Sequence, residues 1–88
     1  MMKLKFSPTF EKKLKTINHK DKKLGIKIHK QLKVFQLNPH HPSLRLHKLK
    51  GNLKDVWSIS VTISFRLLFV EDNEHYFFDM GEHSEIYK

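Results

Sequence analysis

Two residues near the end of the chain carry side chains that can take part in chemistry. His83 has an imidazole, which can move a proton near neutral pH. Tyr87, four positions later, has a phenol ring that can stack on a nucleic-acid base. Chain ends often fray, so a role for these residues requires an ordered end. We expect this end to pack against a sheet, with His83 facing Arg66.

A basic segment in the middle of the chain supplies a second histidine and several cations. The run from Arg45 to Gly51 places His47 among closely spaced basic side chains. Such a cluster suits the binding of a nucleic-acid backbone, and its histidine suits proton transfer at a phosphodiester. The same pattern is also compatible with an exposed basic loop. The candidate backbone-binding residues are Arg45, Lys48, Lys50 and Lys54.

Arg66 interrupts an otherwise apolar run, Phe65–Val70. A guanidinium is seldom placed in such a run without a partner. Its planar set of donors can bind a phosphate, or it can pair with one of the acidic side chains that follow it in the sequence. Composition alone favours neither of these two interpretations.

The residue types argue against several other kinds of site. The chain has no cysteine, which excludes a disulfide framework and a thiolate nucleophile. It has no glycine-rich phosphate loop and no serine elbow. His40 and His41 are adjacent and lack metal-ligand spacing, so we expect neither a metal nor a cofactor. RNA can be cut without a metal when its own 2′-hydroxyl attacks the adjacent phosphate, a reaction that needs a base, an acid and cations.

The charge of +8 is distributed unevenly along the 88 residues. Residues 1 to 54 hold fifteen basic residues against two acidic ones, a net charge of +13. Residues 55 to 88 hold two basic residues against seven acidic ones, a net charge of −5. A basic front part indicates a polyanion or an acidic protein as partner. A lysine-rich surface that only keeps the protein soluble is the alternative.

The hydrophobic pattern predicts a strand, two helices and then several strands. Ser7-Pro8 is typical of a helix start, and Asp21 can cap a second helix. Apolar residues then change from helical to alternating spacing. The expected elements are a strand at 4–6, a helix from 8 to 17 with a turn at 18–20, a helix that starts after Asp21 and ends at Asn38-Pro39, strands at 44–47, 57–63, 65–70 and 76–78, and a hairpin turn at 71–74.

This order of elements predicts an α+β fold with two layers. The helical hairpin packs on one face of a twisted sheet, because neither layer can bury its apolar face alone. Residues 1–88 are expected to form a single domain, since the chain supports one modest core. No leader sequence and no membrane-spanning stretch is evident, so a cytoplasmic location is expected.

Four segments of the chain resemble the RelE/ParE superfamily of toxins from toxin–antitoxin pairs, and most closely its YafQ-like branch. The resemblance covers nearly the whole chain, and its most specific element is the ending that contains Gly81, His83 and Tyr87. The four segments are L-H-K-L-K-G at 46–51, D-V-W-S-I at 55–59, F-R-L-L-F at 65–69 and D-M-G-E-H-S-E-I-Y at 79–87.

The resemblance implies a type II toxin that cuts mRNA in the ribosomal decoding site as an endoribonuclease, or mRNA interferase. It implies that His83 and His47 match catalytic histidines, that Tyr87 matches the terminal aromatic residue, and that Arg66 matches an arginine that contacts phosphate. It also implies a cognate antitoxin that silences the toxin. We expect at least the toxin-binding segment of this antitoxin to be acidic and to fold as a helix or an added strand.

Two other functions stay open at this point. A ParE-like toxin has the same fold, inhibits DNA gyrase through protein contacts and needs neither an acid nor a base. A basic RNA-binding module would bind phosphates with a steep salt dependence and would cut nothing.

Overall fold

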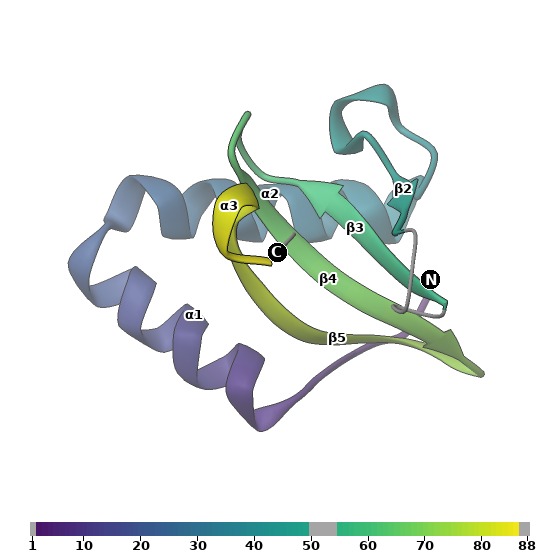
Figure 1. The fold of residues 1–88 in the computed structure, drawn as a ribbon, viewed down its shortest axis with the longest axis horizontal. Helices are drawn as coiled ribbons and strands as arrows, with labels where there is room; N and C mark the ends of the chain where they lie inside the picture. The colour runs from purple at the N-terminus through teal and green to yellow at the C-terminus, as the bar shows by residue number, and fades with distance from the viewer. Residues whose placement is uncertain (1, 50–54, 87–88) are drawn as a thin grey trace.

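The computed structural model describes residues 2–49 and 55–86. Its elements follow in the order β1 (Leu4–Phe6), α1 (Pro8–Lys20), α2 (Lys22–Leu37), the 3-10 turn η1 (Pro42–Leu44), β2 (His47–Lys48), β3 (Val56–Ser60), β4 (Phe65–Asp72), β5 (Glu74–Glu82) and α3 (His83–Ile86). The strands form one sheet in the order β1-β5-β4-β3-β2 (Figure 1). β1 pairs parallel with β5 and the other pairs are antiparallel. The expected α+β architecture, with an N-terminal strand, a helical hairpin and an antiparallel meander, is therefore confirmed.

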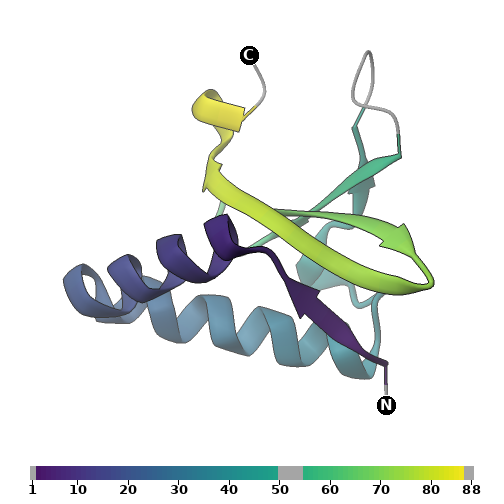
Figure 2. The ribbon, with the colours of Figure 1, turned by 90° about the horizontal axis from the view of Figure 1, so that it is seen from below.

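The two long helices cover one face of the sheet, and α3 lies on the opposite side (Figure 2). The main core lies between the long helices and the sheet, where Phe10, Ile28, Ile59, Leu67 and Phe77 are fully buried. Among the described residues, no helix is long and apolar enough to cross a membrane. We call the opposite side of the sheet, formed by residues that alternate with this core set, the free face.

Side-chain caps define both ends of the helical hairpin. The Ser7 hydroxyl accepts a hydrogen bond from the Phe10 amide at 3.0 Å and starts α1, as Ser7-Pro8 predicts. The predicted turn at 18–20 is wrong, because α1 continues to Lys20. Asp21 alone makes the connection, since its amide donates to the Ile17 carbonyl at 2.7 Å while its carboxylate accepts from the Leu24 amide at 3.1 Å.

Gly25 lies where the two long helices approach each other. A Cβ atom at this position would lie 3.3 Å from the Asn18 Cα atom, which is tight for a backbone contact, and would also meet the Asn18 side chain. Glycine lowers helix stability by about 1 kcal/mol relative to alanine. Close packing of the two helices explains why glycine occupies an interior position of α2.

The strands around the sheet's β2 edge are shorter than predicted. In place of a strand at 44–47, η1 leads to Arg45 in the left-handed region, with φ 46°. The strand β2 that pairs with β3 covers His47–Lys48 in the described part of the chain. β3 ends at Ser60, before the predicted limit at residue 63. The Thr62 hydroxyl accepts a hydrogen bond from the Phe65 amide at 3.0 Å, so it stabilises a turn where the alternating pattern predicted strand.

Gln31 connects α2 to the end of β3. It is buried, with 7% of its surface exposed, and its Nε2 donates to the carbonyl of Ser60 at 2.9 Å and to that of Ser43 at 3.3 Å. These bonds hold η1 and the end of β3 against the same helix. The side chain therefore helps to position the elements that flank the free face.

We predict that Gln31→Met lowers the free energy of unfolding by about 1 to 3 kcal/mol, because it leaves the buried Ser60 carbonyl without its donor. Urea denaturation followed by circular dichroism measures this difference. Gln36→Met is the matched control, since Gln36 Nε2 donates to the Met2 carbonyl at the periphery of the fold. Equal losses in the two variants would contradict the special role of Gln31.

Candidate active site

The free face carries a mixture of polar and apolar side chains. Ile59 and Leu67 are fully buried under the helices, so Ser58, Ser60 and Arg66 project from the opposite face. A smaller apolar cluster lies on this side, with Leu49, Val56 and Leu68 at its centre and Val70, Phe78 and Ile86 around it. The sheet is therefore buried on both faces near its middle, and its polar groups gather toward one end.

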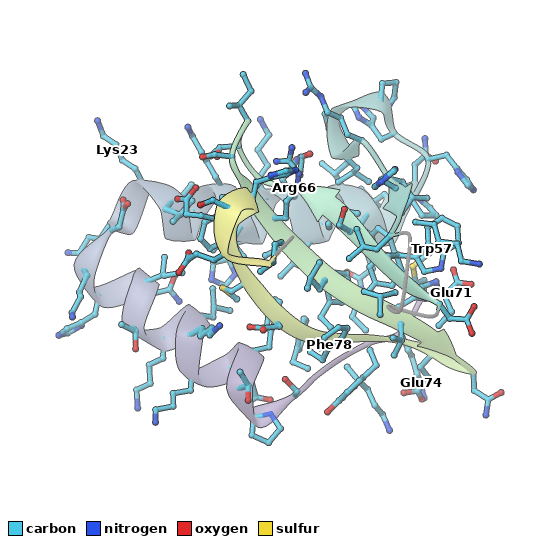
Figure 3. The ribbon with its side chains drawn as sticks, in the orientation of Figure 1. Lys23, Trp57, Arg66, Glu71, Glu74 and Phe78 are labelled. Atoms are coloured by element: carbon cyan, nitrogen blue, oxygen red, sulfur yellow. The ribbon has the colours of Figure 1, made fainter. Side chains whose placement is uncertain are left out.

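Arg66 lies at that end of the free face, beside α3 (Figure 3). In the strand register it is opposite Ser60 on one side and Gly81 on the other. Its Nη1 donates to the Thr62 carbonyl at 2.7 Å and to the Phe65 carbonyl at 3.3 Å. Among the described residues, no carboxylate lies within 4 Å of this guanidinium, so these backbone contacts leave its charge uncompensated.

His83 is the first residue of α3, and its amide donates to the Ser64 carbonyl at 2.6 Å. α3 folds back over β5, because Ile86 packs into the apolar cluster of the free face. A Cβ at Gly81 would lie 3.1 Å from Ile86 Cγ2, so glycine permits this close contact. The Glu85 carboxylate accepts from the Glu82 amide at 3.1 Å and caps the short helix. The expected ordered end is present as far as Ile86.

The turn between β3 and β4 contacts both Arg66 and His83. Its Thr62 carbonyl accepts from the Arg66 guanidinium, and its Ser64 carbonyl accepts from the His83 amide. The Thr62 hydroxyl accepts from the amides of Ser64 and Phe65, at 3.3 and 3.0 Å, and so fixes the turn itself. One four-residue turn, Val61–Ser64, thus holds the arginine side chain and the start of the helix that carries the histidine.

His47 lies on the same face but farther away. His47 in β2 pairs with Ser58 in β3, and directly opposite residues in an antiparallel pair share a face. β3 separates it from β4, and Ser58 is opposite Leu68, two residues beyond Arg66. Strand spacing and rise place its Cα roughly 12 Å from that of Arg66. His47 is exposed, so its ring is accessible to a ligand.

Among the predicted backbone-binding residues, Arg45 and Lys48 differ in their surroundings. Arg45 is exposed just before β2. Lys48 projects toward the helix side of the sheet, where its Nζ lies 5.9 Å from the centre of the Trp57 ring and 3.5 Å from the Asp55 carboxylate. Lys48 is therefore directed away from the free face. The other predicted residues, Lys50, Lys54 and Tyr87, lie outside the described part of the chain.

Ser60 is a further polar residue of the free face that was not among the site residues predicted from the sequence. Its side chain is 5% exposed, and its Oγ has no hydrogen-bond partner among the described residues. It lies directly opposite Arg66 on the free face. A buried hydroxyl without a partner is uncommon in proteins, and this one lies on the strand next to Arg66.

The sequence matches no family model, and none of the curated proteins matches it. Solved structures match it closely in fold. The YoeB/ParE toxin from Agrobacterium tumefaciens aligns with a TM-score of 0.78 and 18% identity, covering 93% of this chain and 99% of the toxin. YafQ from Escherichia coli strain BL21(DE3) aligns with a TM-score of 0.71 and 19% identity over 100% of both chains.

A Staphylococcus aureus structure is more similar in sequence. The matched chain of its heterotetrameric YoeB–YefM toxin–antitoxin complex aligns with a TM-score of 0.74 and 29% identity, covering 94% of this chain and 98% of that one. The fold matches these toxins over nearly the whole length, in agreement with the resemblance carried by the four sequence segments. The chain therefore shares its fold with toxins of toxin–antitoxin systems, and this likeness supports its assignment to the RelE/ParE superfamily.

Proposed function

We propose that the chain is a toxin that cuts mRNA in the ribosomal decoding site as a metal-independent endoribonuclease and thereby inhibits translation. The observation that carries this proposal is the placement of Arg66 and His83 at one end of the free face, both held by the Val61–Ser64 turn. A guanidinium with no acidic partner in the described part of the chain, together with a histidine at the same end of the surface, suits a phosphate that gains charge during reaction.

The reaction that fits these groups is an internal transfer within the RNA. The 2′-oxygen attacks the adjacent phosphorus and loses its proton to a base, while the bond from phosphorus to the 5′-oxygen breaks and an acid protonates that oxygen. The products are a 2′,3′-cyclic phosphate and a 5′-hydroxyl end. His83 transfers one of the two protons, and Arg66 stabilises the charge on the phosphate oxygens.

His47 acts on a different part of the substrate than Arg66 does. The rough 12 Å between their Cα atoms is set by strand geometry, so one RNA strand must extend across the free face to reach both. Tyr87 is proposed to stack on a base near His83. Arg45, Lys50 and Lys54 are proposed to contact the backbone near His47, whereas Lys48 contributes only to the general positive potential.

The proposed partner is a cognate antitoxin with an acidic toxin-binding segment. Related toxins occur in solved complexes with antitoxins, such as YefM with YoeB and DinJ with YafQ. The +13 charge of residues 1 to 54 favours an acidic partner for this chain. A toxin that acts on translating ribosomes works in the cytoplasm.

A gyrase inhibitor of the ParE type is the second candidate, because the Agrobacterium tumefaciens neighbour is described as a YoeB/ParE toxin. Such a toxin acts through protein contacts and requires no imidazole. The proposal therefore depends on whether His83 is needed for activity, and a supercoiling assay with purified gyrase provides the direct alternative measurement.

We predict that His83→Ala lowers the rate of mRNA cleavage on translating ribosomes by about 10² to 10⁴-fold, because that is the usual contribution of a positioned acid or base. Mapping the 5′-hydroxyl ends of ribosome-bound mRNA measures the rate. The matched control is His19→Ala, which removes an exposed imidazole from α1.

Two results would contradict the ribonuclease proposal. One is cleavage by His83→Ala at the wild-type rate, and the other is an absence of cleavage by the wild type together with inhibition of gyrase supercoiling. Steep salt-dependent RNA binding without any cleavage would instead identify a plain RNA-binding module.

We predict that Thr62→Ala lowers the rate of cleavage at saturating substrate about 10- to 100-fold, because a small displacement of Arg66 and His83 is costly in an active site. Thr62→Ser keeps the hydroxyl that accepts from the Ser64 and Phe65 amides and should retain most of the rate. Single-turnover kinetics on ribosomes separate this effect from substrate binding. Equal rates for the alanine and serine variants would show that the hydroxyl has no positioning role.

A further inference from the structure

The last part of β5 has a strand on one side only. On the β1 side, backbone contacts end at Ser7, whose amide and hydroxyl donate to the carbonyls of Phe77 and Phe78 at 2.9 and 2.8 Å. From Asp79 onward, β5 pairs with β4 alone in the described part of the chain. This stretch of β5 leads directly into α3, and its outer side faces α1, which lies alongside it (Figure 1).

The outer side of this stretch presents both backbone polar groups of Met80. Hydrogen-bonded and non-bonded residue pairs alternate along an antiparallel ladder. Because the His83 amide donates to the Ser64 carbonyl, the amide and carbonyl of Met80, three residues earlier, point away from β4. Met80 is buried, and buried backbone groups require hydrogen-bond partners. With β4 on the opposite side, these partners must come from another part of the chain.

Lys13 of α1 and the carboxylate of Asp79 provide these partners. The Lys13 Nζ donates to the Met80 carbonyl at 3.2 Å and to the Asp79 Oδ1 at 2.6 Å. The same Oδ1 accepts from the Met80 amide at 2.8 Å. We call this arrangement of Lys13, Asp79 and the Met80 backbone the lysine clip. It takes the place of a neighbouring strand and joins the end of β5 to α1.

The lysine clip crosses a cleft between α1 and the chain end that carries His83. The cleft has a volume of about 650 Å³, with Thr16 of α1 on one wall and Gly81 and Ile86 on the other. Because open space separates these walls, packing alone does not fix the distance between α1 and the end of β5. The bonds of the Lys13 side chain supply this constraint.

The position of the lysine clip connects it to the candidate active site. Gly81 follows Met80 directly, is opposite Arg66 in the strand register and lies against Ile86 of α3. Two residues after Gly81, the chain reaches His83. A shift of the Met80 backbone therefore changes where His83 lies relative to Arg66.

We propose that Lys13 is a positioning residue, which holds the end of β5 through the lysine clip and thereby sets the position of His83 relative to Arg66. The proposal deepens the proposed function and rests on it for the reaction. As an ion pair, Lys13–Asp79 adds little to stability, because its side chains are 47% and 32% exposed. Its effect is on geometry, so it is expected in the cleavage rate and not in the free energy of unfolding.

The test compares Lys13→Met with Lys12→Met in the full chain. Methionine keeps the apolar stem and removes the donors, and Lys12 is the matched control because it lines the same cleft. Lys13→Met is expected to lower the single-turnover rate of mRNA cleavage at saturating ribosomes about tenfold, because a small displacement is costly in an active site. The ribosome concentration at half-maximal rate should not change. Lys12→Met should match the wild type in rate, and urea denaturation should give equal free energies of unfolding for both variants.

Two conservative variants separate the hydrogen bonds from the charges. Lys13→Arg keeps donors that can reach the Met80 carbonyl and is expected to recover most of the rate. Asp79→Asn keeps an oxygen acceptor for the Met80 amide while it removes the charge, and it is also expected to retain most of the rate. Asp79→Leu removes the acceptor and should be as slow as Lys13→Met.

The position of His83 is measured without RNA in the chain labelled with ¹⁵N. The backbone amide signal of His83 should shift in Lys13→Met and remain in place in Lys12→Met, because its 2.6 Å bond to the Ser64 carbonyl depends on the path of β5. If the wild type cuts no RNA, the ribonuclease proposal fails and this signal alone decides on the lysine clip. A shift then supports the clip, and an unchanged signal overturns it.

The kinetic results against the proposal are equally definite. It is overturned if Lys13→Met cuts at the wild-type rate, or if the change is confined to the ribosome concentration at half-maximal rate. Equal losses in Lys13→Met and Lys12→Met would show that the two lysines only attract RNA. A loss of rate without a shift of the His83 amide signal would also overturn it.

Discussion

The ring of Phe77 is the point at which the layers of this fold meet. It is fully buried, and its centre lies 6.0 Å from the ring of Phe6, 5.8 Å from Phe10, 5.4 Å from Phe35 and 5.0 Å from Phe69. These rings come from β1, α1, α2 and β4. Removing a buried phenylalanine costs about 3 to 5 kcal/mol in typical cores. The position of β5 in the sheet therefore depends on contacts to both neighbouring strands and both long helices.

This constraint on β5 also determines where the candidate active site forms. Three residues beyond Phe77, Met80 is again buried against the helices, and Gly81 then brings α3 close to the strand on the other face. Ile86 joins the small apolar cluster around Leu68. The segment with His83 is thus held by the main core before it and by a second cluster after it, which is how a chain end is ordered.

Much of this fold follows from local patterns in the sequence. The alternation around Ile59 correctly separates the helix-side face of β3 from a free face with Ser58, because side chains of a strand alternate whatever the strand pairs with. The apolar run Phe65–Val70 shows no such alternation, so it does not indicate on which face Arg66 lies. The helix starts at Ser7-Pro8 and Asp21 also depend on neighbouring residues only. Such features require no knowledge of long-range contacts.

The remaining features depend on specific hydrogen bonds or on distant packing. The end of β3 is set by the Thr62 hydroxyl, which bonds within its own turn and overrides an alternating pattern that continues to Ile63. The four residues of α3 form a helix only with the Glu85 cap and the contact of Ile86 to the sheet. The separation of His47 from Arg66 follows from strand register, which spacing along the chain does not determine.

The fold brings some lysines of the basic front part of the chain next to acidic residues of the remaining part. Three pairs join a lysine of residues 1 to 54 to an acid of residues 55 to 88. They are Lys5–Glu74, Lys13–Asp79 and Lys48–Asp55, with distances of 3.3, 2.6 and 3.5 Å. All three are substantially exposed, so each contributes about 0 to 1 kcal/mol to stability. Their main effect is on the potential, because they offset positive charge on β1, α1 and β2. The five lysines of α2 have no such pairs among the described residues, and the helix has no acidic residue, so it keeps its positive charge in full.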